Sequence, residues 1–167
     1  RARIAERGCG VQRLVSLSAD QVDRFIADGF VKLEDAFPRE TAAACADILW
    51  REMGLSPDRP EQWTRPVVRL GMHAEAPFRE AATSPRLYTA LDQLVGKDRW
   101  IPPASLGAMV VRFPAAGPPG DDGWHIDASF PPDDDPATHD YFQWRVNAVS
   151  RARALLMLFL LSDCGPD

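Results

Sequence analysis

The chain has 167 residues, of which 46% are hydrophobic and 26% charged, and this balance excludes wholesale disorder. Its 19 basic and 24 acidic side chains give a net charge of −5. This charge argues against nucleic acid or an anionic membrane surface as the partner, because neutralising phosphates requires clustered lysine and arginine. The longest apolar run, residues 154–161, is too short to span a bilayer, which takes about 20 residues.

The first hundred residues are predicted to be mainly helical. Ser18 and Gln21 stand three positions apart as in a capping box, and Gly29 suits the left-handed residue that ends a helix. A second helix is predicted at residues 38–54, with proline in its first turn and glycine at its end. A third helix, at residues 84–96, carries the same two signals.

Strands and loops are predicted elsewhere. A short strand is expected at residues 31–33, and the prolines of residues 57–77 predict a long loop between the second and third helices. Beyond residue 100, strands are predicted at residues 106–113, 124–130, 141–149 and 154–162. Since helices come first and strands later, we predict one α+β domain over residues 1–167, with a helical half at 1–100 and a strand-rich half at 101–167.

Residues 123–130, with the sequence GWHIDASF, hold the pattern that points most directly to chemistry. In a strand, side chains two positions apart project from the same face, so His125 and Asp127 are expected to point to one side. An imidazole and a carboxylate held side by side supply two of the three ligands of the facial triad that binds Fe(II) in non-haem oxygenases. The pattern is short, and its alternative is a His–Asp hydrogen bond on a solvated strand.

The chain also resembles a known family. Residues 123–130, residues 150–163, and residues 28–33 with the capped helix before them are similar to the phytanoyl-CoA dioxygenase family. The resemblance extends over nearly the whole chain. It implies N-terminal helices packed on a double-stranded β-helix, which is a jelly-roll or cupin-like fold, and it implies Fe(II), 2-oxoglutarate and O₂.

This resemblance makes His125 and Asp127 the first two iron ligands. Halogenases of this type have a small residue in place of the carboxylate, so Asp127 favours hydroxylation. Arg112 and Asn147 are candidates for binding 2-oxoglutarate. Their alternatives are a cap on the sheet edge for Arg112 and an amide bonded to strand backbone for Asn147.

One part of the family pattern is missing from the sequence. The third iron ligand is a distal histidine, followed by an arginine that pairs with 2-oxoglutarate, whereas His139 is the only histidine after Asp127 and comes too early to have crossed a barrel. The strands predicted after residue 100 are also too few for an eight-stranded jelly roll. We therefore expect this chain to be the N-terminal portion of a longer protein, with the distal histidine and arginine beyond Asp167.

Other polar and aromatic side chains receive structural interpretations. We interpret His139 as a solvated loop residue rather than part of the mouth of a site, and His73 as structural rather than lining a pocket. Phe142 and Trp144 are expected in the core rather than in a substrate wall. Residues 133–135 lack the spacing of a calcium-binding loop.

The sequence therefore predicts a non-haem Fe(II)- and 2-oxoglutarate-dependent dioxygenase that hydroxylates an unactivated C–H of a small-molecule or acyl substrate. Residues 57–77 and 114–136 are the candidate lid loops. The alternatives are a metal-free or inert cupin-like ligand-binding module and a metal hydrolase with the same ligands. Cys9, Cys45 and Cys164 lack the CxxC spacing of a zinc site and indicate reduced thiols in a cytoplasmic protein.

Overall fold

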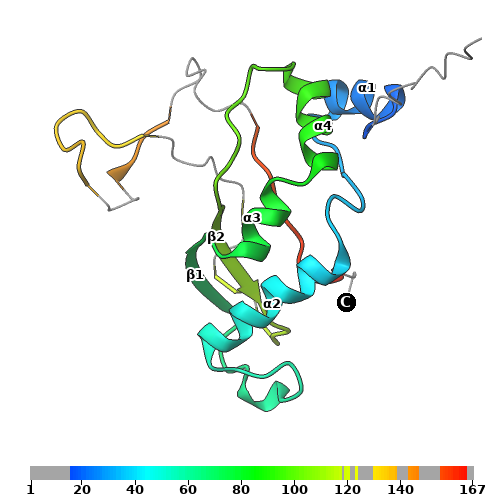
Figure 1. The fold of residues 1–167 in the computed structure, drawn as a ribbon. Coiled ribbons are helices and arrows are strands. Elements are labelled where there is room, and N and C mark those ends of the chain that lie inside the picture. The colour runs from blue at the N-terminus through cyan, green and yellow to red at the C-terminus, as the bar shows by residue number, and fades with distance from the viewer. Residues whose placement is uncertain are drawn as a thin grey trace, which may run out of the picture.

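The computed structural model describes residues 16–117, 119–120, 123, 130–138, 143–146 and 155–164. In chain order these residues form α1 (Ala19–Asp28), α2 (Arg39–Met53), the short 3₁₀ helix η1 (Pro60–Gln62), β1 (Val67–His73), α3 (Ala76–Ala82), α4 (Pro85–Val95) and β2 (Leu106–Arg112). The fold is a small α+β domain in which β1 and β2 form an antiparallel sheet and α2 and α3 lie beside one of its faces (Figure 1). No helix in the described part of the chain is long and apolar enough to cross a membrane.

The three helices predicted from local signals are confirmed. At the start of α1, the Ser18 hydroxyl accepts from the N–H of Gln21 and the Gln21 side chain accepts from the N–H of Ser18, which completes a capping box. Gly29 ends this helix at φ 81°, and Gly54 ends α2 at φ 66°. Ser84 caps α4 with its side chain. Each boundary depends on residues that are close in sequence, so the sequence alone locates it.

The long loop predicted at residues 57–77 is wrong. This region contains η1 and β1 and runs into α3, so β1 lies in the sheet rather than in a lid. Pro77 stands in the first turn of α3, where its missing N–H would have had no helical partner. Arg69 and Gly71 interrupt the apolar pattern of β1, and the backbone hydrogen bonds of this strand come from its pairing with β2.

The two strands pair in an antiparallel register with an irregularity near the end of β1. Leu70 lies opposite Met109, whereas the register shifts around Met72 before His73 meets Leu106. Such a bulge re-aims the side chains that follow it. As a result, His73 and Leu106 are both buried, at 6% and 4% exposure. The strand predicted at residues 106–113 is confirmed as β2.

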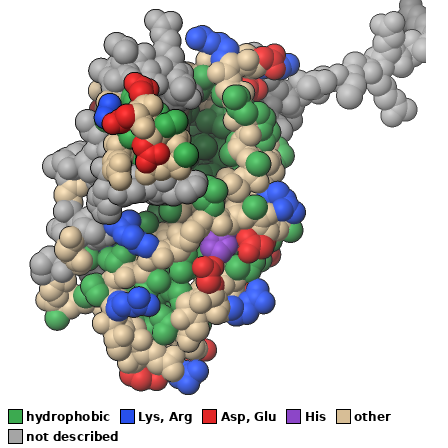
Figure 2. All heavy atoms as spheres, turned by 90° about the vertical axis from the view of Figure 1, so that its left-hand side faces the viewer, with side chains coloured by type: hydrophobic (Ala, Val, Ile, Leu, Met, Phe, Trp, Pro, Cys, Tyr) green, Lys and Arg blue, Asp and Glu red, His purple; other side chains and the backbone are tan. Residues whose placement is uncertain are grey.

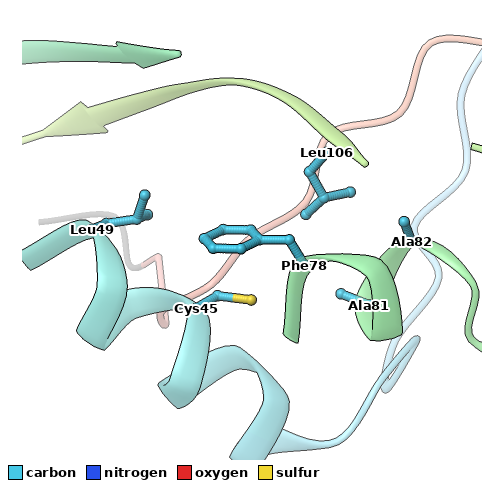
Figure 3. Packing of buried hydrophobic residues seen from close by; sticks show 6 residues of the cluster. All are labelled: Cys45, Leu49, Phe78, Ala81, Ala82 and Leu106. Carbon is cyan, nitrogen blue, oxygen red and sulfur yellow. The ribbon is translucent and has the colours of Figure 1, made fainter. Parts of the chain in front are cut away.

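The hydrophobic core lies between the sheet and helices α2 and α3. Phe78 of α3 is fully buried and points between Cys45 and Leu49 of α2 and Leu106 of β2 (Figure 3). Burial of a side chain of this size contributes roughly 1.5–3 kcal/mol. Because α3 has only 7 residues, it is too short to be stable as an isolated helix, and this packing holds it in place.

A single amide side chain fastens the residues before α1 to α4. Gln93 Oε1 accepts from the N–H groups of Ser16 at 3.1 Å and Leu17 at 3.0 Å, and its Nε2 donates to the Leu17 carbonyl at 2.8 Å. The Ser16 hydroxyl also donates to the Arg86 carbonyl at 2.7 Å. Leu17 is only 1% exposed. Because a buried backbone group without a hydrogen-bond partner is costly, these bonds stabilise the folded chain.

The strand expected at residues 31–33 is wrong. These residues belong to the connection between α1 and α2 and pair with no strand in the described part of the chain. The carbonyl groups just after them are bonded to α4 and its cap instead, since Arg86 Nε donates to the Glu34 carbonyl at 2.9 Å and the Ser84 hydroxyl donates to the Ala36 carbonyl. A strand requires a hydrogen-bonded neighbour, so the alternating sequence remains a loop.

Residues 155–161, within the strand predicted at 154–162, have the burial pattern of a strand but pair with none among the described residues. Phe159 packs against the core and stacks on Phe37 with a ring-centroid separation of 5.8 Å. The alternate side chains are 67%, 88% and 62% exposed for Leu156, Leu158 and Leu160. This segment therefore attaches to the core by one face and leaves an apolar face open.

Removing the Gln93 amide is expected to destabilise the fold. Gln93→Ala leaves three backbone hydrogen bonds unmade, and we expect the free energy of unfolding, measured by urea denaturation, to fall by about 1–3 kcal/mol. Gln93→Glu keeps the acceptor oxygen but sets a second oxygen against the Leu17 carbonyl, so it should also destabilise the chain. A Gln93→Glu unfolding curve that overlays the wild-type curve would contradict this account.

Neighbouring positions in residues 155–161 are expected to respond differently to truncation. Phe159→Ala removes a ring from the core and should lower the free energy of unfolding by about 1–3 kcal/mol. Leu158→Ala, the control at an exposed site, should change it by less than about 0.5 kcal/mol. Chemical denaturation measures both effects. Equal effects at the two positions would contradict the alternation of packed and exposed side chains along residues 155–161.

Candidate functional site

The predicted site residues fall mostly outside the described part of the chain. His125, Asp127 and Asn147 lie outside the described residues. Arg112 is described: it is the exposed last residue of β2 and lies opposite Val67 of β1. Cys9, His139 and Phe142 of the sequence analysis also lie outside the described residues.

The last residue of the predicted ligand strand forms an antiparallel bridge. Phe130 and Arg145 exchange two backbone hydrogen bonds, 3.2 Å from the Phe130 nitrogen and 2.9 Å from the Arg145 nitrogen. Phe130 is the last residue of the strand predicted at 124–130, and Arg145 lies within the strand predicted at 141–149. The bridge therefore joins the two predicted strands at Phe130, which is the one described residue of the first strand.

An acidic turn lies between the two bridged residues. Trp144 is half-buried and donates from Nε1 to the Thr138 carbonyl at 3.1 Å, so it is attached to this turn. Arg145 lies 3.7 Å from Asp134 in an exposed ion pair. Residues 133–135 are exposed, and within the described residues no three His, Cys, Asp or Glu side chains are grouped to hold a metal ion. The acidic run is a solvated turn, as the sequence predicted.

The sheet face turned away from the helices carries two arginines. Arg69 lies opposite Val110, and Arg112 lies opposite Val67. Because side chains two positions apart share a face, Arg69 and Arg112 are diagonal neighbours. Basic side chains lie among hydrophobic ones on the side of the molecule shown in Figure 2. Both arginines interact with other groups of the chain, and guanidinium groups suit the paired hydrogen bonds of a carboxylate.

An aromatic cluster at the end of the sheet was not predicted from the sequence. The rings of Trp50, Trp63 and Phe113 have centroids 5.2, 5.7 and 5.8 Å apart. A cavity of about 40 Å³ beside Trp63 has Gln62 in its lining. Gln62 Oε1 is buried without a hydrogen-bond partner. Since one water molecule occupies about 30 Å³ in the liquid, the cavity suits a bound water rather than a substrate.

A wider, open groove of about 560 Å³ lies along the C-terminal half of α2. Its lining residues are Asp47, Trp50, Arg51, Leu55, Ser56 and Pro57. These residues include no histidine or cysteine, so the groove offers neither a nucleophilic thiol nor an imidazole base. Neither of these two hollows provides the metal-ligand chemistry predicted from the sequence.

The structural interpretation of His73 agrees with its burial in the core. Its ring stacks on Phe78 with a centroid separation of 4.6 Å. Cys45, in the same core, is a free thiol. Burial, together with the negative charges of Glu80 and Glu75, raises the pKa of the Cys45 thiol to about 11. A thiol with so high a pKa is a poor nucleophile and belongs to the packing rather than to a reaction centre.

No protein-family model, curated protein or solved structure matches this chain. Its function is therefore inferred from its own residues.

Cys45 is expected to resist thiol reagents while the chain is folded. In a Cys9→Ser/Cys164→Ser variant, modification by a maleimide should be at least about a hundredfold slower in the folded chain than in urea, because both burial and the low thiolate fraction protect the sulfur. A Cys9→Ser/Cys45→Ser variant retains the exposed Cys164 as the control and should react at similar rates in both conditions. Rapid labelling of Cys45 in the folded chain would contradict this prediction.

Proposed function

We propose that this chain is the N-terminal part of a non-haem Fe(II)- and 2-oxoglutarate-dependent dioxygenase of the phytanoyl-CoA dioxygenase type. The observation that carries the proposal is the sequence of residues 123–130, in which His125 and Asp127 stand two positions apart in a predicted strand. The similarity of this segment, and of residues 150–163, to the family supports the same assignment.

The bridge between Phe130 and Arg145 supports a strand at this place. Phe130 is three positions after Asp127, and a strand that carries the ligand pair requires antiparallel pairing near this position. On a regular strand, side chains separated by an odd number of positions project from opposite faces. The proposal therefore puts the Phe130 ring on one face and the side chains of His125 and Asp127 on the other.

The open apolar face of residues 155–161 supports the jelly-roll part of the proposal. A jelly roll consists of two sheets whose inner faces cover each other. A segment that packs on the helices with one face and exposes leucines on the other is suited to lie between helices and a second sheet. In this proposal, the additional strands, the distal histidine ligand and the arginine that pairs with 2-oxoglutarate lie beyond Asp167.

The residues of the chain have distinct roles in the proposed enzyme. When bound, iron and 2-oxoglutarate supply the oxidising chemistry that converts a C–H bond to C–OH with O₂, with release of succinate and CO₂. His125 and Asp127 hold the metal through a ring nitrogen and a carboxylate oxygen. Arg112, on the same sheet face as Arg69, and Asn147 are the proposed donors to 2-oxoglutarate. The substrate is a small molecule or an acyl group.

Anaerobic titration of the full-length protein with Fe(II) and 2-oxoglutarate tests this proposal. We expect a weak visible charge-transfer band under anaerobic conditions, and succinate production once O₂ is admitted. His125→Ala should abolish both, because it removes one of the two metal ligands in this chain. His139→Ala, the matched control at a histidine to which no ligand role is assigned, should retain both.

Two other outcomes would overturn the proposal. A wild-type protein without a band and without turnover is the result expected of an inert cupin-like binding module. Turnover that needs neither O₂ nor 2-oxoglutarate is the result expected of a metal hydrolase.

A further inference from the structure

His73 is a buried polar side chain for which the proposed function has no use. It ends β1, lies opposite Leu106 of β2, and has a side chain that is only 7% exposed. Phe78 covers its ring at an interplanar angle of 22°. Acidic side chains gather around it, as the red groups beside the purple histidine in Figure 2 show.

Both nitrogens of the imidazole face a carboxylate. Nε2 lies 3.1 Å from Glu52 Oε2, at the end of α2, and Nδ1 lies 3.3 Å from Glu75 Oε2, just before α3. A neutral imidazole has one N–H and one lone pair. In the neutral tautomer protonated at Nε2, a lone pair faces Glu75, and in the tautomer protonated at Nδ1 the ring carries no positive charge to attract Glu52. The protonated ring can donate from Nδ1 to Glu75, and its positive charge attracts both carboxylates.

The two contacts differ in kind. Nδ1 is within hydrogen-bond distance of Glu75, whereas Nε2 is buried without a directed hydrogen bond although Glu52 is within ion-pair distance. An undirected contact of this kind is favourable when the ring carries a positive charge, since charge attraction depends less on angle than a hydrogen bond does.

The other ionisable groups around His73 are mostly acidic. Glu52 of α2 and Glu75 before α3 lie within ion-pair distance of the ring. The further ionisable groups of these two helices that the core brings together are Cys45, Arg79 and Glu80. The facing residue of β2, Leu106, and the core residues of 155–161 are apolar.

Two of these groups are already engaged elsewhere. The Arg79 guanidinium donates to the Ala74 carbonyl, and Glu80 accepts from the Thr41 hydroxyl at 2.8 Å. His73 lies within ion-pair distance of both Glu52 and Glu75. The pKa of the Cys45 thiol is raised first by burial and then by the negative charges of Glu80 and Glu75.

We propose that protonated His73 is a pH-responsive clamp that joins the end of α2 and the start of α3 to the sheet through Glu52 and Glu75. Proton binding tightens the packing of the helices on the sheet, and proton loss loosens it. The clamp connects three elements that are separate in sequence, so its release weakens the core as a unit.

The sign of the pH dependence follows from proton binding. Because the clamp depends on the positive charge of the ring, it stabilises the fold at low pH and is lost as the pH rises and the ring gives up its proton. The other limit comes from Glu75. Its own backbone N–H and then the His73 side chain lower the pKa of the Glu75 carboxyl below its usual 4.5, so this contribution is lost as the pH falls through the lowered value. The clamp therefore operates between these limits.

Urea denaturation of the full chain and of His73→Gln across this pH range tests the proposal. The glutamine is neutral and keeps one donor and one acceptor. We expect the unfolding equilibrium constant of the wild type, relative to that of the variant, to increase by up to about tenfold per pH unit as the pH rises from about 5.5 to about 8. Glu52→Gln should reduce this dependence, whereas Glu40→Gln, at the other end of α2, should leave it unchanged.

Nitrogen NMR of the His73 ring gives a second measurement that does not depend on the variant folding. Both ring nitrogens should be protonated in the folded wild-type chain at about pH 7, where a free imidazole is mostly neutral. A neutral ring at that pH, or a ratio of the two unfolding constants that does not change with pH, would overturn the proposal.

Discussion

A sheet of two strands is marginal by itself, and in this protein it depends on the packing of Phe78 against Cys45 and Leu106. This contact brings together α3, α2 and β2 around one buried ring. It is also what keeps α3 helical, because 7 residues are too few for an isolated helix. The remaining described elements are arranged around this layer: α4 receives the N-terminal segment through Gln93, and residues 155–161 attach through Phe159.

Because the helices pack on only one face of the sheet, its two faces carry different kinds of side chain. The helix side is apolar apart from His73, whose charge is matched by Glu52 and Glu75 in the proposed clamp. The other side carries Arg69 and Arg112 at diagonal positions. His73 and its two carboxylates therefore lie on the opposite side of the sheet from Arg112, the residue of β2 that the proposed oxygenase would direct toward its co-substrate.

β2 relates the two proposals in space. Its first residue, Leu106, lies opposite His73, and its last residue, Arg112, precedes the segment that contains the proposed iron ligands. The clamp thus acts at one end of the ladder and the proposed co-substrate donor stands at the other. The two proposals nevertheless have independent tests, since one is measured by proton binding and the other by metal and 2-oxoglutarate binding.

The sequence by itself determined α1, α2, α4 and β2, because caps, prolines, glycines and apolar spacing within a few residues specify them. It also singled out His125 and Asp127 as a chemical pair, and this remains a prediction because both lie outside the described residues. Only the tertiary structure decided that residues 67–73 are a strand, that residues 31–33 are not, and that Arg69 shares a face with Arg112. The physical reason is that a strand exists through hydrogen bonds to a partner distant in sequence, and neither that partner nor its register is written in the strand's own residues.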